Sequence, residues 1–289
     1  MTPLIGRTGA ATTLHPYVHR EGRPMIGNHD FQHNDLALRS TVHIPDGPAT
    51  RWPTVIFIHG FANNRIETGA SFVRMSRLLQ DAGIASVRVD LSGHGESDGD
   101  FAQVTITGEI AEARSVVRTV RTFDFVDRDR IGLVGMSMGG VVAGIVAAEE
   151  PGITAACLWS PAAVAPFEVG AGRLKGRDIN AEINEKGYFD ADGHRMSPAL
   201  VEDITKLDVY GRSCAYTGPV RIIHGDQDDI APIHYARRYL DHYNGNAELE
   251  TVEGADHGWS TVPHRTHLHQ STLNFLSHHL KPVDLGGER

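Results

Sequence analysis

The sequence predicts an α/β protein in which a mostly parallel central sheet is flanked by helices on both faces. Two observations support this fold class. Short, continuous apolar runs alternate with segments of helical spacing, and several of the runs end in glycine-rich loops. Parallel strands need long crossover connections, which are usually helices, so this alternation favours parallel pairing. With 289 residues, the chain is long enough for one large domain.

The strands are expected where apolar and β-branched residues follow one another, as in "TVIFIHG" at residues 54–60. A run without polar alternation is typical of a strand that is buried on both faces. The expected strands, some given with the loop that follows them, cover residues 36–45, 54–60, 84–95, 130–136, 154–161, 219–226 and 247–259.

The helices are expected where apolar residues recur at helical spacing and the pattern ends at glycine or proline. They cover residues 72–83, 107–123, 139–152, 234–243 and 269–280. The first 25 residues show no regular pattern. Residues 162–215 also break the alternation, with scattered glycine and charge. We therefore expect residues 1–289 to form a single domain, with a core at about 25–161 and 216–280 and a small inserted lid at 162–215.

Composition excludes several classes of protein. The formal net charge of −9 disfavours a nucleic acid or an anionic membrane as partner, because both require a basic surface. No apolar run is long enough to span a membrane, and the first residues lack the apolar stretch of a signal peptide. Two cysteines cannot form a disulfide framework in a chain of this length. We expect a cytoplasmic protein.

A serine lies between two glycines in "IGLVGMSMGG", residues 131–140, where a predicted strand meets a predicted helix. Reversal of the chain within one or two residues would place Ser137 at positive φ, and Gly135 and Gly139 would avoid the resulting clash. Ser137 would then be exposed above the sheet, with the N–H of Met138 directed at the same point. The alternative is an ordinary glycine-rich junction with a capping serine.

A serine nucleophile needs a base and an orienting acid, and both are found after later strands. "VEGADHGW" places His257 just beyond the last predicted strand, and "HGDQDD" offers Asp226, Asp228 and Asp229. The carboxyl ends of parallel strands are where open α/β sheets place their sites. The residues alone leave the choice among the three aspartates open, and the alternative for His257 is a solvated loop residue.

A second oxyanion donor is expected after the strand at residues 54–60. Gly60 permits a close approach of the backbone, so the N–H of Phe61 is the candidate donor. The alternative is a simple turn. Phe167, Tyr188 and Phe189 in the insertion are expected to form an apolar wall over the acyl group of a substrate.

Five motifs in this order resemble the α/β-hydrolase fold, and within it the cinnamoyl and feruloyl esterases. They are "HGF" (59–61), "DLSGHGESDG" (90–99), "GMSMGG" (135–140), "HGDQDD" (224–229) and "GADHGW" (254–259). The resemblance extends from about residue 36 to residue 280. It implies Ser137 as nucleophile, His257 as base and Asp228 as acid. It also implies that the N–H groups of Phe61 and Met138 form the oxyanion hole.

The resemblance further implies that a polar residue near the start of the lid binds a phenolic hydroxyl, and Glu168 occupies the matching stretch. Beyond Glu168 the lid departs from the family in sequence. The predicted activity is that of a serine esterase acting through an acyl-enzyme on hydroxycinnamate or similar small aromatic esters. Neither a metal nor an organic cofactor is expected. The expected partner is a small-molecule ester, with no nucleic acid or membrane, and a homodimer is compatible with the sequence.

Other activities on the same fold remain alternatives: a general short-chain carboxylesterase or thioesterase, a serine peptidase, or a cofactor-free perhydrolase. A non-catalytic binding protein on a hydrolase scaffold is the alternative from another class. "HRTHLH" (264–269) is interpreted as a surface helix start rather than a metal site, and "DADG" (190–193) as a turn. Asp90 and His94 are expected to shape their loop rather than to catalyse.

Overall fold

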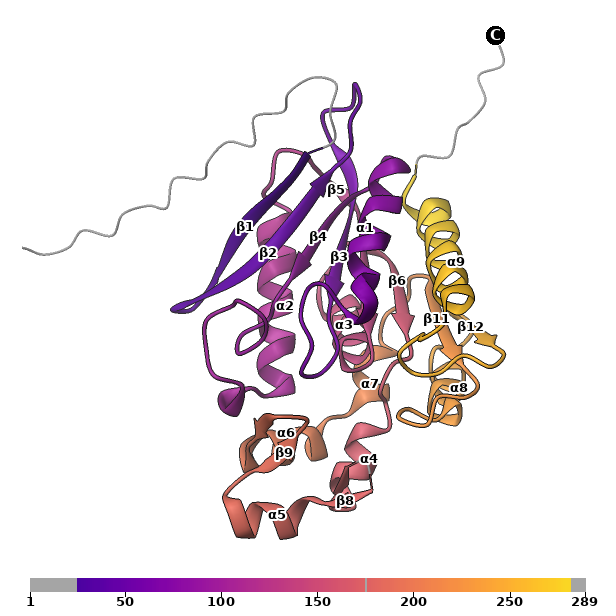
Figure 1. Ribbon diagram of the computed structural model, residues 1–289. Coiled ribbons are helices and arrows are strands. Elements are labelled where there is room, and N and C mark those ends of the chain that lie inside the picture. The colour runs from indigo at the N-terminus through magenta and orange to yellow at the C-terminus, as the bar shows by residue number, and fades with distance from the viewer. Residues whose placement is uncertain (1–24, 175, 282–289) are drawn as a thin grey trace, which may run out of the picture.

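The computed structural model describes residues 25–174 and 176–281. Within these residues, eight strands form one sheet in the order β1-β2-β4-β3-β5-β6-β11-β12 (Figure 1). The strands of this sheet are β1 (Met25–His33), β2 (Leu36–Ile44), β3 (Trp52–Ile58), β4 (Ala85–Val89), β5 (Val126–Met136), β6 (Ile153–Trp159), β11 (Val220–Gly225) and β12 (Ala247–Val252). Every neighbouring pair from β4 to β12 is parallel, whereas β2 is antiparallel to both β4 and β1. The predicted fold class is confirmed.

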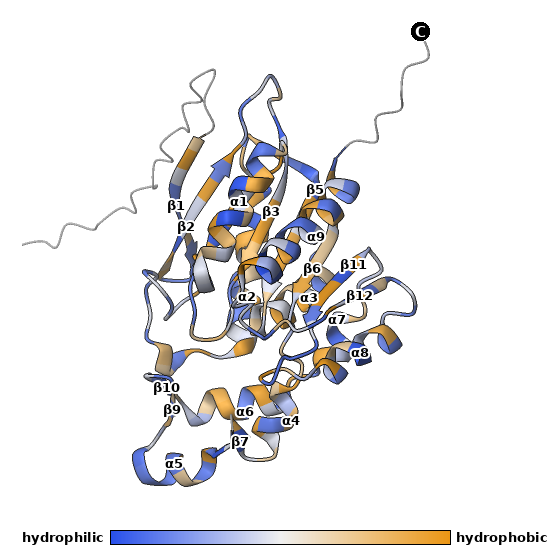
Figure 2. Cartoon of the chain, turned by 45° about the vertical axis from the view of Figure 1, so that its right-hand side comes forward, coloured by the Kyte–Doolittle hydropathy of each residue, from blue (hydrophilic) through white to orange (hydrophobic). Residues whose placement is uncertain are grey.

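Helices cover both faces of the sheet (Figure 1). On one face lie α1 (Ser71–Asp81) and α9 (Val262–Leu280), and on the other lie α2 (Ile106–Val120), α3 (Met138–Glu149) and α8 (Ile233–His242). Because side chains alternate along a strand, each buried strand contributes to two cores. In β3, Val55 and Phe57 belong to the core beneath α1 and α9, whereas Ile56 and Ile58 belong to the core on the other face. Figure 2 shows the apolar strands enclosed between these layers.

The helix α3 approaches the sheet closely because its first turns contain glycine. A Cβ atom at Gly139 would lie 2.2 Å from the carbonyl oxygens of both Ile58 and His59. Only glycine can occupy this position without displacing β3. The close approach brings the start of α3 next to the loop that follows β3, and the candidate site forms between them.

The chain between β6 and β11 forms a lobe beyond the carboxyl ends of the strands (Figure 1). It contains α4 (Ala165–Gly170), β7 (Arg173–Leu174), β8 (Arg177–Asp178), α5 (Ile179–Lys186), β9 (Phe189–Ala191), β10 (His194–Met196), α6 (Pro198–Lys206) and α7 (Val209–Ser213). Helix α4 packs on α6, which in turn contacts α2, while β10 contacts η2 (Phe101–Gln103). Helix α7 packs against α3 and so joins the core. Residues 192 and 193 form the turn of the β9–β10 hairpin, as expected for "DADG".

Outside the insertion, one strand and one helix differ from the sequence-based expectations. The strand β1 was not expected, because Phe31 is the only one of its nine residues that is fully buried and an edge strand gives little hydrophobic signal. Helix α9 begins at Val262, seven residues before the expected start, with Thr261 as N-cap and Pro263 in its first turn. The expectation of irregular structure at the N-terminus falls largely on residues 1–24, outside the described residues. None of the described helices has the length and apolar character needed to cross a membrane.

Candidate active site

Ser137 occupies the sharp turn between β5 and α3. Its backbone has φ 56° and ψ −119°, a conformation that costs a non-glycine residue energy. Both sides of the turn hold it in place: the Ser137 N–H donates to the carbonyl of Trp159 at 2.9 Å, and the Ser137 carbonyl accepts from the N–H of Gly140 at 3.0 Å. A Cβ at Gly135 would lie 2.0 Å from the carbonyl oxygen of Gly139, so the turn requires glycine there. This strained turn is the one the sequence predicts.

The structure brings Ser137, His257 and Asp228 into one chain of hydrogen bonds. Nε2 of His257 lies 2.9 Å from Oγ of Ser137, and Nδ1 of His257 lies 2.8 Å from Oδ2 of Asp228. An ionised carboxylate can only accept, so Nδ1 carries the ring proton and Nε2 is free to accept the proton of the serine hydroxyl. His257 is thus oriented as a base toward Ser137.

Asp228 is held as an anion by its surroundings. Its side chain is fully buried, and Oδ1 accepts from the backbone N–H groups of Ile230 at 3.0 Å and Ala231 at 2.7 Å. Burial by itself would raise the pKa of Asp228, but hydrogen bonds from His224 and His257 outweigh it and hold the pKa well below its usual range. The carboxylate is therefore available to support a positive charge on His257.

The three aspartates have separate positions; the residues alone could not choose among them, and the family resemblance implied Asp228. Only Asp228 bonds His257, whereas Asp226 accepts from the N–H of Gly254 at 2.8 Å and Asp229 lines the cavity beside Ser137. Sequence reasoning missed His224, whose Nε2 lies 3.1 Å from Oδ2 of Asp228 and 2.7 Å from the carbonyl oxygen of Ala231. The available signal was its place in "HGDQDD", four residues before Asp228.

Phe61 and Met138, the predicted oxyanion donors, both lie at the cavity that contains Ser137. Met138 is the first residue of α3, so its N–H belongs to the end of the helix where backbone donors lack helical partners. Phe61 follows Gly60, where a Cβ would lie only 3.4 Å from Cβ of Ser137. The two backbone segments, one at the start of α3 and one in the loop after β3, thus approach Ser137 from different elements.

The cavity has a volume of about 590 Å³ and a mostly apolar wall. The apolar residues that line it include Phe61, Met136, Met138, Val164, Val169, Leu174, Phe189, Met196, Ile204 and Ile230. Glu168 and Arg177 of the insertion also line it, and the charge of Arg177 is paired with Glu182.

Of the four residues predicted to bind the substrate, Glu168 and Phe189 line the cavity, whereas Phe167 and Tyr188 do not. Phe167 and Tyr188 directly precede Glu168 and Phe189 in the chain, but their side chains pack elsewhere. Phe167 is 43% exposed and packs outside the cavity against Tyr235. Tyr188 instead lies beneath the guanidinium of Arg195.

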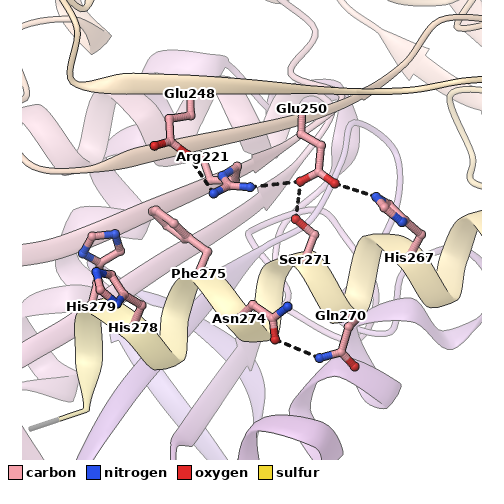
Figure 3. Close-up of a pocket in the computed structure, with 10 residues that line it drawn as sticks. All are labelled: Arg221, Glu248, Glu250, His267, Gln270, Ser271, Asn274, Phe275, His278 and His279. Atoms are coloured by element: carbon pink, nitrogen blue, oxygen red, sulfur yellow. Dashed lines mark hydrogen bonds and ion pairs between the residues drawn. The ribbon is translucent and has the colours of Figure 1, made fainter. Parts of the chain in front are cut away.

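A second cavity of about 550 Å³ lies between β12 and α9 (Figure 3). Its charges are paired with one another: Arg221 bonds Glu248 and Glu250, and the hydroxyl of Ser271 donates to Glu250. The only serine that lines this groove is bound to a carboxylate rather than to a base. It therefore lacks the arrangement that Ser137 has.

The histidines of "HRTHLH" point away from one another around the first turns of α9. His267 bonds Glu250 in the groove of Figure 3, while His269 points inward and bonds Ser71. Throughout residues 25–174 and 176–281, no group of three or more His, Cys, Asp or Glu side chains is placed to hold a metal ion.

The family model described as the alpha/beta hydrolase family matches residues 55–267, which include Ser137, Asp228, His257 and both predicted oxyanion donors. This chain belongs to the α/β-hydrolase family. Membership confirms the resemblance inferred from the five motifs and places the protein among the hydrolases.

Individual relatives of this α/β hydrolase are distant in sequence. Over 196 residues it is 26% identical to the mitochondrial palmitoyl-protein thioesterase ABHD10 of Bos taurus, an alignment that covers 65% of this chain and 61% of the relative. Over 209 residues it is 30% identical to the 2,6-dihydropseudooxynicotine hydrolase of Paenarthrobacter nicotinovorans, covering 72% of this chain and 52% of the relative. The chain thus spans less than two thirds of the length of either relative.

Among solved structures, Est1E of Butyrivibrio proteoclasticus with ferulic acid bound superposes on this α/β hydrolase with a TM-score of 0.79. The two proteins are 29% identical, and the match covers 87% of this chain and 98% of Est1E. Because only 13% of this chain lies outside the match, part of the insertion lies within it.

Proposed function

We propose that this α/β hydrolase is a serine esterase that cleaves small carboxylic esters through an acyl-enzyme. The observation that supports this proposal most strongly is the hydrogen-bonded chain from Ser137 through His257 to Asp228 at the wall of an apolar cavity. A nucleophile, a base and an orienting acid in this order are the components of acyl transfer.

In the proposed reaction, Oγ of Ser137 attacks the ester carbonyl while Nε2 of His257 takes the hydroxyl proton. Asp228 stabilises the imidazolium that results. The N–H groups of Phe61 and Met138 stabilise the negative oxygen of the tetrahedral intermediate. As the intermediate collapses, the C–O bond to the alcohol breaks and the alcohol leaves with the proton from His257. Water, activated by His257, then releases the acid from the acyl-enzyme by the same steps.

We propose a small aromatic acyl group, such as a hydroxycinnamate, as the substrate class. The apolar wall suits a flat ring, and Glu168 adds one acceptor for a phenolic hydroxyl. The ferulic acid bound to the similar protein Est1E is a ligand of this chemistry. In this proposal the insertion between β6 and β11 acts as the lid over the acyl group.

The experiment that tests this class compares methyl ferulate with methyl cinnamate, which lacks the phenolic hydroxyl. Glu168→Ala should raise KM for the ferulate by about tenfold and leave the cinnamate unchanged, because a hydrogen bond to a charged acceptor is lost for one substrate only. Phe167→Ala, a change next to Glu168 but outside the cavity, should affect neither ester. Equal effects of Glu168→Ala on both substrates would contradict the role of the phenolic hydroxyl.

A thioesterase is a second candidate, favoured by the 26% identity with a palmitoyl-protein thioesterase. The same three residues would serve, since a thioester carbonyl is attacked in the same way. Butyryl-coenzyme A and a palmitoylated peptide, assayed beside methyl ferulate, separate the candidates by kcat/KM. A higher value for either thioester would replace the hydroxycinnamate proposal.

A further inference from the structure

The loop after β3 contains a buried carboxylate that the proposed reaction does not use. Glu67 is only 6% exposed and lines the same cavity as Ser137 and His257. Oε1 accepts the N–H of Gly60 at 2.7 Å, while Oε2 accepts from the side-chain amide of Asn63 at 2.6 Å and the N–H of Thr68 at 2.8 Å. Both oxygens are thus occupied by groups of the loop itself.

The carboxylate of Glu67 lies next to Gly60, the residue before the proposed oxyanion donor Phe61. A Cβ at Gly60 would lie 3.2 Å from Oε1 of Glu67 and 3.4 Å from Cβ of Ser137, so the same glycine separates the carboxylate from the nucleophile. Gly60 supplies the carbonyl half of the peptide group whose N–H belongs to Phe61. A shift of Gly60 would therefore move the Phe61 N–H with it.

The other side of Gly60 is fixed as well. Its carbonyl oxygen accepts the N–H of Asn63 at 3.1 Å and lies 2.9 Å from Nδ1 of His59. Carbonyl and N–H point in opposite directions across a planar trans peptide. Holding the Gly60 carbonyl against His59 and Asn63 therefore turns the Phe61 N–H to the opposite side of the peptide.

His59 is held in a single protonation state. Burial lowers its pKa to about 4, so the ring is neutral at physiological pH. Its Nε2 accepts the N–H of Leu91 at 3.1 Å, which leaves the ring proton on Nδ1. Nδ1 is consequently the donor to the carbonyl of Gly60.

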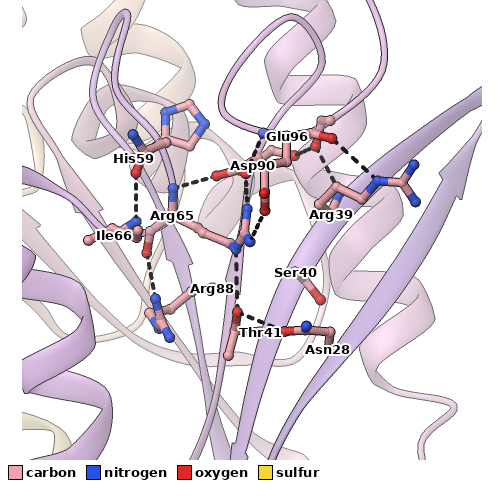
Figure 4. Close-up of polar contacts among 12 residues, drawn as sticks. Asn28, Arg39, Ser40, Thr41, His59, Arg65, Ile66, Arg88, Asp90 and Glu96 are labelled. Carbon is pink, nitrogen blue, oxygen red and sulfur yellow. Dashed lines mark hydrogen bonds and ion pairs between the residues drawn. The ribbon is translucent and has the colours of Figure 1, made fainter.

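The far end of the loop is tied to β4 and the loop that follows it (Figure 4). Arg65 bonds the buried carboxylate of Asp90 through its backbone N–H and its guanidinium, and the Arg65 carbonyl accepts from Arg88 at 2.9 Å. Two residues after Arg65, Glu67 adopts φ 61° and ψ 164°, a region otherwise populated by glycine. The loop is therefore strained as well as tethered, and Glu67 joins its strained end to Gly60.

We propose that Glu67 is a positioning residue of this hydrolase: its carboxylate fixes the Gly60–Phe61 peptide so that the Phe61 N–H meets the oxyanion. This inference rests on the proposed function, because it requires an oxyanion to form at Ser137. Glu67 acts through the backbone and does not touch the substrate.

The test measures hydrolysis of p-nitrophenyl butyrate by Glu67→Ala and Glu67→Gln. Glu67→Ala should lower kcat by about 100-fold with little change in KM, because a misplaced oxyanion donor weakens the transition state and not the bound ester. Glu67→Gln keeps one oxygen that can accept from Gly60, and should recover about tenfold of that loss. The inhibition constant of a trifluoromethyl ketone, which forms a tetrahedral oxyanion adduct, should rise in parallel with the loss of kcat/KM.

Glu112→Gln is the matched control. Glu112 is also buried and holds a loop by accepting the N–H of Ser92 at 2.8 Å, but that loop contains neither proposed oxyanion donor. This control should keep the wild-type kcat. A folded Glu67→Ala protein with wild-type kcat, a change confined to KM, or a Glu67→Gln protein as impaired as Glu67→Ala would each overturn the inference. Ser137→Ala is assayed in parallel, since activity retained there would refute the proposed function instead.

Discussion

Two serine–histidine pairs of this hydrolase have hydrogen bonds of nearly the same length but lie in different surroundings. Oγ of Ser137 lies 2.9 Å from Nε2 of His257, and Oγ of Ser71 lies 2.7 Å from Nε2 of His269. The first pair lies at a cavity, whereas neither member of the second lines that cavity. By distance alone, the second pair would be the better candidate for catalysis.

The groups around each histidine decide between them. Asp228 bonds His257 and is placed to stabilise the imidazolium that forms when His257 takes a proton. Within the described part of the chain no carboxylate bonds His269; burial, together with Arg265 and Arg74, lowers its pKa to about 4. A base must gain a proton during the reaction, and His269 is surrounded by groups that oppose this. The comparison shows that a serine–histidine contact becomes a candidate site only with an acid, a cavity and oxyanion donors.

The two pairs should differ most in how removal of the serine affects ester hydrolysis. Ser137→Ala should reduce kcat by about 10⁶-fold, the loss seen when a triad serine is removed. Ser71→Ala should leave kcat at the wild-type value. Hydrolysis of p-nitrophenyl butyrate and labelling by a fluorophosphonate measure both, and labelling of the Ser137→Ala protein would show that the nucleophile lies elsewhere.

Replacing Asp228, the acid beside the first pair, should have the next largest effect. Asp228→Asn should lower kcat by about 10⁴-fold, because an amide can no longer hold His257 in the tautomer that accepts the serine proton. Asp226→Asn is the control, since Asp226 bonds the backbone at Gly254 instead. If Asp226→Asn proved the more damaging change, the assignment of the acid would be reversed.

For the buried pair, the expected effect is on stability. Ser71→Ala leaves Nε2 of a buried histidine without its partner and should lower the free energy of unfolding by about 1–3 kcal/mol. Urea denaturation followed by circular dichroism measures this value. A fully stable Ser71→Ala protein with reduced kcat would mean that this pair also takes part in the reaction.

The smallest effect is in the pH dependence of stability. The folded-state pKa of His269 is lowered from 6.5 to about 4, so between these pH values the unfolded chain binds more protons than the folded one. Its contribution to stability is therefore complete above about pH 6.5 and is lost as the pH falls toward 4. In the His269→Gln protein, the midpoint of urea denaturation should therefore fall less steeply over this pH range.

The fall should not vanish in His269→Gln, because burial also lowers the pKa of His43 and His59 to about 4. Their contributions have the same sign and occupy the same pH range. An unchanged slope in the His269→Gln protein would show that folding does not lower the pKa of His269.

Much of the site could be predicted because its signals are local. The turn at Ser137 follows from the spacing of Gly135 and Gly139, positions at which a Cβ atom would clash with adjacent backbone. The position of His257 follows from its place just after the last strand. The start of α9 also has a local signal, since Thr261 followed by Pro263 is typical of a helix N-terminus. The prediction placed the start later because the first turns of the helix are polar and show no apolar periodicity.

Other features depended on residues distant in the chain. Ser71 and His269 are 198 positions apart, and their contact exists only because α1 and α9 pack on the same face of the sheet. Glu67 has an unremarkable place in the sequence, and its importance follows from the fold of its loop around Gly60. The position of Phe167 outside the cavity also depends on distant residues, because the ring packs against Tyr235 of α8.

By itself, the sequence determined the alternation of strands and helices, the sharp turn at the serine and the order of the three triad residues along the chain. These are properties of short segments, fixed by backbone sterics and apolar periodicity. Only the tertiary structure decided which aspartate reaches His257, which wall residues face the cavity and which of two serine–histidine pairs has an acid beside it. Those choices depend on distances between segments that only the packed sheet and its helices bring together.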